Sequence, residues 1–183
     1  MVVLEQETLL SVEKPARYIG REVNSIIKDI EKVDIHFGFC FPDLYEIGMS
    51  CLGLYILYYL INNREDSYCE RFFAPAHDME QIMKQQNLPL FSLETKTEMS
   101  SFDILGFTLQ YEMCYTTVLN MLALGRVPAF ARDRGEDAPI VCAGGPCAYN
   151  PAPIEEFFDF FYIGEGEVNL DAVLDIFAEN KKQ

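Results

Sequence analysis

The sequence has few basic residues and no long apolar run. Its 183 residues include 14 Lys and Arg against 29 Asp and Glu, a formal net charge of -15 at pH 7. Nucleic-acid affinity comes largely from Lys and Arg that displace counterions, so we predict that this segment binds neither DNA nor RNA. The sequence contains no run of about 18 apolar residues, the length needed to cross a membrane. Residues 1–10 lack the pattern of a signal peptide. We therefore expect a cytoplasmic protein without a membrane partner.

Common catalytic and metal-binding motifs are also missing. The six cysteines form no C-x-x-C pair, and His36 and His77 are too far apart in sequence for a zinc motif. No G-x-G-x-x-G follows the first predicted strand, no P-loop occurs, and no cysteine has a basic sequence neighbour that would lower its pKa. These gaps disfavour a self-contained nucleotide-dependent or thiol enzyme. Most cysteines are expected to be reduced core residues.

Apolar periodicity predicts alternating strands and helices from residue 33 onward. Strands are expected at residues 33–41, 69–74, 103–109, 139–143 and 157–163. Helices are expected at residues 51–63, 78–86, 113–124 and 167–179, the first capped by Ser50 and the third ended by Gly125. This order predicts a doubly wound α/β domain with a mainly parallel sheet in three layers.

The chain length suits one domain with one core. We assign residues 33–183 to that domain. Residues 1–32 are a lead-in that packs on it, with a helix indicated by the spacing of Val23, Ile26 and Ile30.

The predicted helix at residues 51–63 is apolar on almost every side. Such a helix is either buried or faces a partner surface. We favour a core helix. The alternative is a contact with further protein or with a second copy of the chain, which would make a homo-oligomer.

Glycines cluster after the last two predicted strands. Gly144 and Gly145 precede Pro146, and Gly164 and Gly166 follow the final strand. Ligands of parallel sheets bind at the carboxyl ends of the strands, and glycine lets a ligand approach the main chain. We expect the loops at residues 42–50, 110–113 and 144–150 to meet along this one edge beneath a flat or phosphorylated ligand.

Several short runs carry a resemblance to a known family. They are Tyr18-Ile19-Gly20, Phe41-Pro42-Asp43, Leu109-Gln110-Tyr111-Glu112, Gly144-Gly145-Pro146 and Gly164-Glu165-Gly166-Glu167. In order and spacing, the chain resembles the cobalamin (B12)-binding domain at the front of many radical SAM enzymes. It is most similar to the amino-terminal part of a bacterial Fe-S oxidoreductase family. The resemblance implies a Rossmann-like (flavodoxin/B12-binding-like) fold and cobalamin as cofactor.

The resemblance also implies which residues would touch a corrinoid. A D-x-H-x-x-G loop, whose histidine coordinates cobalt, corresponds to Asp43, Tyr45 and Gly48. Tyr45 replaces the histidine, and a neutral phenol with a pKa of about 10 is a poor substitute for imidazole. The lower face of the corrinoid would then be unligated by histidine or covered by Tyr45. The alternative is a structural loop in which Asp43 caps a turn and Tyr45 packs.

The other contacts that the resemblance implies flank a channel for the nucleotide tail of the cobalamin. Thr108 corresponds to a small hydroxyl residue after the third strand, although a β-branched strand residue is also expected there. Gly144, Gly145 and the adjacent Pro146 correspond to the glycine pair after the next strand.

The chain has no C-x-x-x-C-x-x-C triplet, so it is not expected to be catalytic alone. The resemblance implies a [4Fe-4S] cluster and S-adenosylmethionine in a downstream radical SAM domain, which this segment would contact. We expect the chain to be part of a longer protein. The alternative is a ligand-free scaffold of the same fold, with its crevice filled by Tyr45, Tyr111 and Tyr149.

Overall fold

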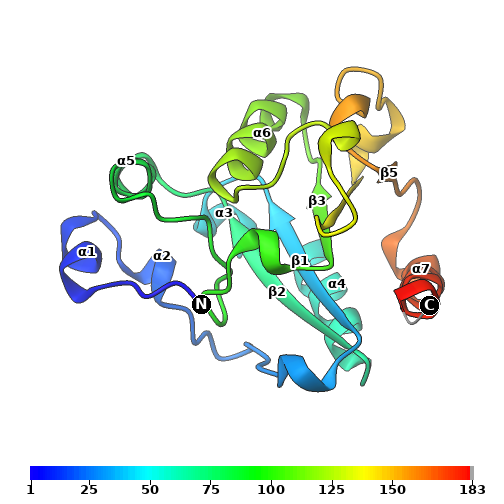
Figure 1. Ribbon diagram of the computed structural model, residues 1–183, viewed down its shortest axis with the longest axis horizontal. Coiled ribbons are helices and arrows are strands. Elements are labelled where there is room, and N and C mark those ends of the chain that lie inside the picture. Colours follow the sequence, from blue (N-terminus) through cyan, green and yellow to red (C-terminus); the bar gives the residue numbers. More distant parts are fainter. Residues whose placement is uncertain (182–183) are drawn as a thin grey trace.

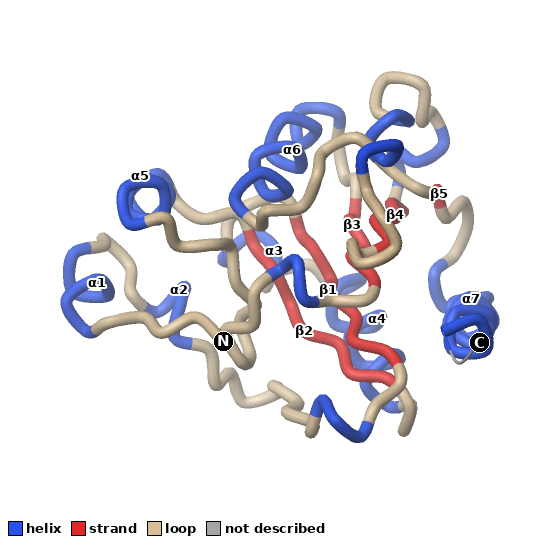
Figure 2. The backbone as a smooth tube through the Cα atoms, in the orientation of Figure 1, coloured by secondary structure: helices blue, strands red, loops and turns tan. Residues whose placement is uncertain are grey.

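The centre of the protein is an all-parallel sheet of five strands in the order β2-β1-β3-β4-β5 (Figures 1 and 2). The computed structural model describes residues 1–181, so the last two positions of the predicted 33–183 domain lie outside the described part. The strands are β1 (Ile35–Phe41), β2 (Ser67–Phe73), β3 (Ile104–Thr108), β4 (Ile140–Gly144) and β5 (Phe160–Phe161). Every neighbouring pair is parallel, which confirms the predicted α/β class.

Helices follow the strands along the chain. The α-helices are α1 (Gln6–Ser11), α2 (Ala16–Ile19), α3 (Tyr45–Gly48), α4 (Leu52–Asn63), α5 (His77–Gln86), α6 (Tyr115–Leu124) and α7 (Gly166–Lys181). Short 3-10 helices are η1 (Ile30–Lys32), η2 (Met99–Ser101), η3 (Glu112–Cys114), η4 (Ala131–Asp133), η5 (Pro146–Tyr149) and η6 (Glu155–Phe157). Within residues 1–181, none of the helices combines the length and apolarity that a bilayer crossing requires.

The two faces of the sheet are covered by different helices, which makes three layers. Side chains alternate along a strand, so Phe37 and Phe39 of β1 pack in the cluster that includes α4 and α7. Cys40 of the same strand points to the opposite face, into the cluster that includes α5 and α6. In Figure 1, α7 lies on the β5 side of the molecule, whereas α1 and α2 lie on the β2 side.

The outer edge of β2 is covered by residues 91–98 and by the amino-terminal segment. The Leu93 amide donates to the Arg71 carbonyl at 2.7 Å, and the Val2 amide donates to the Lys96 carbonyl at 2.7 Å. The fully buried Arg71 side chain also pairs with Glu94 at 2.7 Å. This cover satisfies main-chain groups that an exposed edge strand would leave unpaired.

Three details of the predicted elements are wrong. The final strand is two residues long, because η6 precedes it and the chain leaves the sheet through Gly164, whose φ is +128°. Ser50 does not cap α4; its hydroxyl donates to the Glu46 carbonyl at 2.7 Å instead. No α-helix forms at residues 23–29, where Val23 is exposed and the Ile26 amide donates to the Tyr58 hydroxyl.

Helix α4 has both a buried and an exposed side. Leu54, Tyr58 and Ile61 are buried, which confirms the predicted core helix. Leu52 and Tyr59 remain 71% and 62% exposed on the outer side. The partner contact predicted for this outer side stays a prediction.

Candidate functional site

The loops that follow β1, β3 and β4 lie on one edge of the sheet, as predicted. The Leu109 amide donates to the Gly144 carbonyl at 2.8 Å, and the Cys147 amide donates to the Leu109 carbonyl at 3.1 Å. The Tyr111 hydroxyl donates to the Asp43 carboxylate at 2.8 Å, which joins the loop after β3 to the loop after β1. The parallel sheet therefore brings these distant segments together at its carboxyl edge.

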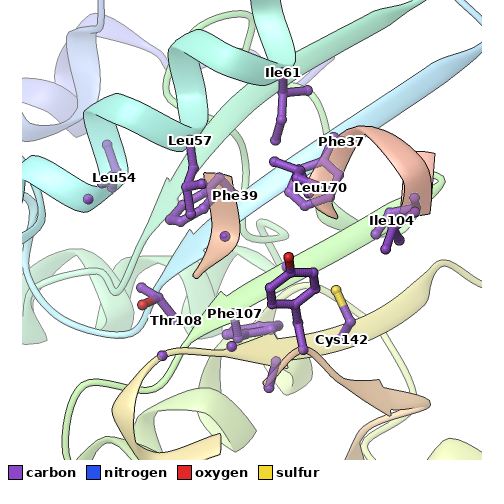
Figure 3. A pocket seen from close by; sticks show the side chains of 18 of the residues that line it. Phe37, Phe39, Leu54, Leu57, Ile61, Ile104, Phe107, Thr108, Cys142 and Leu170 are labelled. Carbon is purple, nitrogen blue, oxygen red and sulfur yellow. The ribbon is translucent and has the colours of Figure 1, made fainter. Parts of the chain in front are cut away.

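A cavity of about 230 Å³ runs from this edge inward between the sheet and the helices α4 and α7 (Figure 3). We call it the edge cavity. Its apolar walls come from β1, α4 and α7, including Phe37, Phe39, Leu57, Ile61, Leu170 and Leu174. Its mouth includes Thr108, Gln110, Gly144, Gly145, Tyr162 and Gly164. Three of the predicted cofactor residues, Thr108, Gly144 and Gly145, thus share one cavity.

The two adjacent glycines have different local environments. A Cβ on Gly144 would meet only the Tyr162 backbone oxygen at 3.6 Å and its Cβ at 3.8 Å, which are ordinary contacts. Gly145 has a φ of +93°, and a Cβ there would lie 3.0 Å from the Leu109 oxygen. The fold therefore requires glycine at 145 but not at 144. Pro146 begins η5 and is not part of the cavity wall.

Polar side chains at the cavity mouth are already paired. The Gln110 side-chain amide donates to the Thr108 hydroxyl. The Tyr162 hydroxyl donates to the Glu165 carbonyl at 3.1 Å and accepts from the Asn169 amide at 3.2 Å. These bonds hold the β5–α7 connection beside the mouth.

The predicted cobalt-ligand loop lies outside the edge cavity. The Tyr45 hydroxyl donates to Glu22 at 3.1 Å, and its ring packs edge-on against Phe73. Burial, together with the nearby Glu22 carboxylate, raises the pKa of Tyr45 to about 12, so the phenol is neutral. A Cβ on Gly48 would collide with Phe73, and the Asp43 carboxylate accepts from the Leu44 amide at 2.8 Å. These are the contacts of the structural alternative, in which Asp43 caps a turn and Tyr45 packs.

Exposed apolar side chains are frequent in the loops and helix starts at the carboxyl edge. They are Ile47, Leu52, Tyr111, Met113, Tyr149, Ile163 and Val168. Their exposed fractions range from 44% for Tyr111 to 83% for Met113. These side chains lie on connections that meet at one edge of the sheet, where exposed apolar groups are available for a contact with a ligand or another protein. We call this set the apolar rim.

Sequence reasoning missed the inner wall of the cavity and the role of Cys142. Cys142 lines the cavity, and burial raises the pKa of its thiol to about 12, so it is no thiolate nucleophile. The alternation in residues 33–41 already placed Phe37 and Phe39 on one face, but not beside a cavity. The space beside them becomes visible only in the structure, which shows how α7 packs against α4 and the strands.

A second set of buried polar groups lies on β1 and β2, away from the carboxyl edge. Glu70 is fully buried and accepts hydrogen bonds from His36 at 2.7 Å and Ser92 at 2.7 Å, as well as from Thr95. Burial alone would raise the pKa of Glu70, but these donors bring it below the ordinary value. Within residues 1–181, no group of three or more His, Cys, Asp or Glu side chains is arranged to hold a metal ion.

Residues 53–183 match the family described as radical SAM proteins, N-terminal, and the chain belongs to this family. A stretch of 145 residues, 78% of the chain, is 30% identical to an uncharacterized protein of Methanocaldococcus jannaschii. The match covers 26% of that protein, so the chain spans about a quarter of the length of this curated relative. The family confirms the predicted association with radical SAM proteins, whereas cobalamin binding stays a prediction.

Proposed function

We propose that this domain is the corrinoid-binding module of a radical SAM protein, in which the edge cavity takes the nucleotide tail of a cobalamin. The observation that carries the proposal is the open position at Gly144. A residue without a side chain stands at the mouth of an apolar cavity, although the fold has room for a Cβ there. A ligand that enters past Gly144 would use that room.

The volume of the cavity favours binding of the nucleotide tail over enclosure of a whole corrinoid. Pockets that enclose a drug-sized ligand have volumes of about 300–1,000 Å³. The edge cavity, at about 230 Å³, suits one flat bicyclic group and excludes a whole corrinoid. The larger part of the ligand would remain outside, at the carboxyl edge that also carries the apolar rim.

The chain's own residues have limited roles in this proposal. Gly144 and Gly145 would admit the tail, Thr108 would lie beside it at the mouth, and the apolar walls would exclude water from it. We do not assign Tyr45 as a cobalt ligand, because its hydroxyl is bonded to Glu22 and the residue lies outside the cavity wall. A bound corrinoid supplies a cobalt ion for group-transfer or radical chemistry.

We further propose that the partner of the module is a downstream radical SAM domain of the same polypeptide, which would hold the [4Fe-4S] cluster and S-adenosylmethionine. The family match and the greater length of the curated relative support this arrangement. The apolar rim is the surface we assign to that contact.

The scaffold alternative is less well supported. It requires that tyrosines fill the crevice, yet Tyr45, Tyr111 and Tyr149 are all outside the cavity wall. Tyr111 and Tyr149 are 44% and 70% exposed on the rim. The cavity is open, so a ligand-binding module accounts for it better.

The proposal is tested by binding of hydroxocobalamin to the purified chain, measured by retained colour after gel filtration at tens of micromolar. We expect the chain to retain the corrinoid. Gly144→Val should weaken binding about tenfold or more, because its side chain fills the mouth. Gly135→Val in an exposed loop is the matched control, because Gly135 has open space around it. Absence of corrinoid from the protein fraction would refute the proposal.

A further inference from the structure

The inner half of the edge cavity is more apolar than its mouth. The strand register places Thr108 beside Gly144 in the row at the carboxyl edge. One row inward, Gly106 is paired with Cys142 and with Phe39. Phe37 and Ile104 are paired in the row after that. The cavity therefore changes from a polar mouth to a hydrocarbon interior along the direction of the strands.

Apolar side chains of the helices also line the inner half of the cavity. Ile61 of α4 and Leu174 of α7 both line the cavity, and both are almost fully buried. Figure 3 shows Ile61 and Leu170 near Phe37, with Ile104 beyond them. The main-chain groups of the central strands are already bonded to their neighbours in the sheet. An aromatic group that reached this depth would meet carbon atoms and the Cys142 thiol.

From this gradient we infer that the edge cavity selects the base of the corrinoid tail, accepting an apolar bicyclic base such as dimethylbenzimidazole and rejecting adenine. The inference rests on the proposed function. Adenine carries an exocyclic amine and several ring nitrogens, which would lose their water on entry. The inner half offers them only the weakly hydrogen-bonding Cys142 thiol, and unpaired buried polar groups are costly.

The direct test compares three corrinoids on the same chain by equilibrium dialysis. They are hydroxocobalamin, its analogue with an adenine base in the tail, and cobinamide, which has no nucleotide tail. We expect hydroxocobalamin to bind about tenfold or more tightly than the adenine analogue. Cobinamide should also bind more weakly than hydroxocobalamin, because it leaves the edge cavity unfilled.

A matched pair of cysteine variants locates the selectivity. Cys142→Ser places a hydroxyl in the cavity wall, where it can pair with a ring nitrogen or amine, so the preference for hydroxocobalamin should fall several-fold. Cys40→Ser makes the same chemical change on the opposite face of the sheet, outside the cavity wall, and should leave the preference unchanged. Thermal melting of both variants verifies that each remains folded at the assay temperature.

The possible outcomes separate the inference from the function on which it rests. Equal affinity for the two tailed corrinoids would overturn the selectivity while leaving binding of the tail intact. Equal affinity for cobinamide would also overturn the placement of the tail in the edge cavity, although the chain would still bind a corrinoid. Failure of all three to bind would overturn both. An unchanged preference in Cys142→Ser would refute the assignment of selectivity to the cavity wall.

Discussion

At the scale of single residues, Gly144 and Gly145 show that neighbouring glycines serve different purposes. Gly145 adopts a φ of +93° beside the Leu109 main chain, so its lack of a side chain is a requirement of the fold. Gly144 meets no such restriction, and this room is what the proposed ligand would use. The sequence predicted the pair as a site but could not separate these two roles, because the difference lies in backbone angles and in the distance to Tyr162.

Gly145→Ala should therefore destabilise the protein, by about 1–2 kcal/mol or more, because a Cβ is unfavourable at this positive φ and meets the Leu109 oxygen. Urea denaturation measures the change. Gly135→Ala, in a loop with open space, should change the free energy of unfolding by less than about 0.5 kcal/mol. Equal effects at the two positions would contradict the assigned backbone requirement.

The buried carboxylate of Glu70 is the clearest source of pH dependence. Hydrogen bonds from His36, Ser92 and Thr95 lower its folded-state pKa below the ordinary value of 4.5. A carboxyl group with a lowered pKa stabilises the fold above its unfolded-state pKa, and this stability is lost as the pH falls through the folded-state pKa. Acid should therefore weaken this part of the core.

Glu70→Gln tests that contribution. The variant should unfold at lower urea concentration at pH 7, with a loss of about 1.5–3 kcal/mol, because a charged hydrogen-bond acceptor is removed. Its difference from the unsubstituted chain should shrink as the pH falls below 4.5. Glu136→Gln, at an exposed position, is the control. A difference that is constant from pH 7 to pH 3 would rule out this role for Glu70.

At the scale of elements, α7 is the least firmly packed part of the cavity wall. It packs mainly against α4 and has few buried side chains, among them Leu174 and Ala178. Arg64 at the end of α4 pairs with Asp171 at 3.1 Å and with Asp175 at 2.6 Å. These partly exposed ion pairs therefore help to position a helix that has few buried side chains.

Arg64→Ala should loosen α7 without unfolding the sheet. We expect faster amide hydrogen exchange in α7, unchanged exchange in β1, and a global loss of about 1 kcal/mol or less, because exposed ion pairs contribute little. Arg132→Ala removes an exposed arginine whose pair with Glu156 is 3.9 Å long, and it should leave α7 unaffected. Unchanged exchange of α7 in the Arg64 variant would show that other contacts hold the helix.

The elements predicted from the sequence are those with strong periodicity. The alternation of Phe37, Phe39 and Phe41 identified β1, and the apolar residues of 51–63 identified α4. The helix indicated by Val23, Ile26 and Ile30 does not form, because the Ile26 amide donates to the Tyr58 hydroxyl of α4 and the Lys28 ammonium donates to carbonyls beside α4 and in β2. The final strand was overestimated because the apolar run also includes Phe157, which lies in η6, and Ile163, which has no register partner in β4.

At the scale of the whole molecule, the strand order determines where the carboxyl edge of the sheet opens to form a crevice. β1 lies between β2 and β3, so the connections from β1 and β3 leave toward opposite faces of the sheet, and the carboxyl edge opens where they diverge. Alternating elements predicted the parallel sheet and the edge on which the loops meet. The cavity itself could not be predicted, because it depends on how α7 is seated relative to α4 and the strands.

The edge cavity is the site that we propose for the tail of a corrinoid. The most direct measurement is a crystal structure of the chain soaked with hydroxocobalamin. We expect electron density for the benzimidazole between β4 and α7, in contact with Gly144, Cys142 and Leu174. A corrinoid seated against Asp43 and Tyr45 with the cavity still open, or crystals that take up no corrinoid, would contradict this placement.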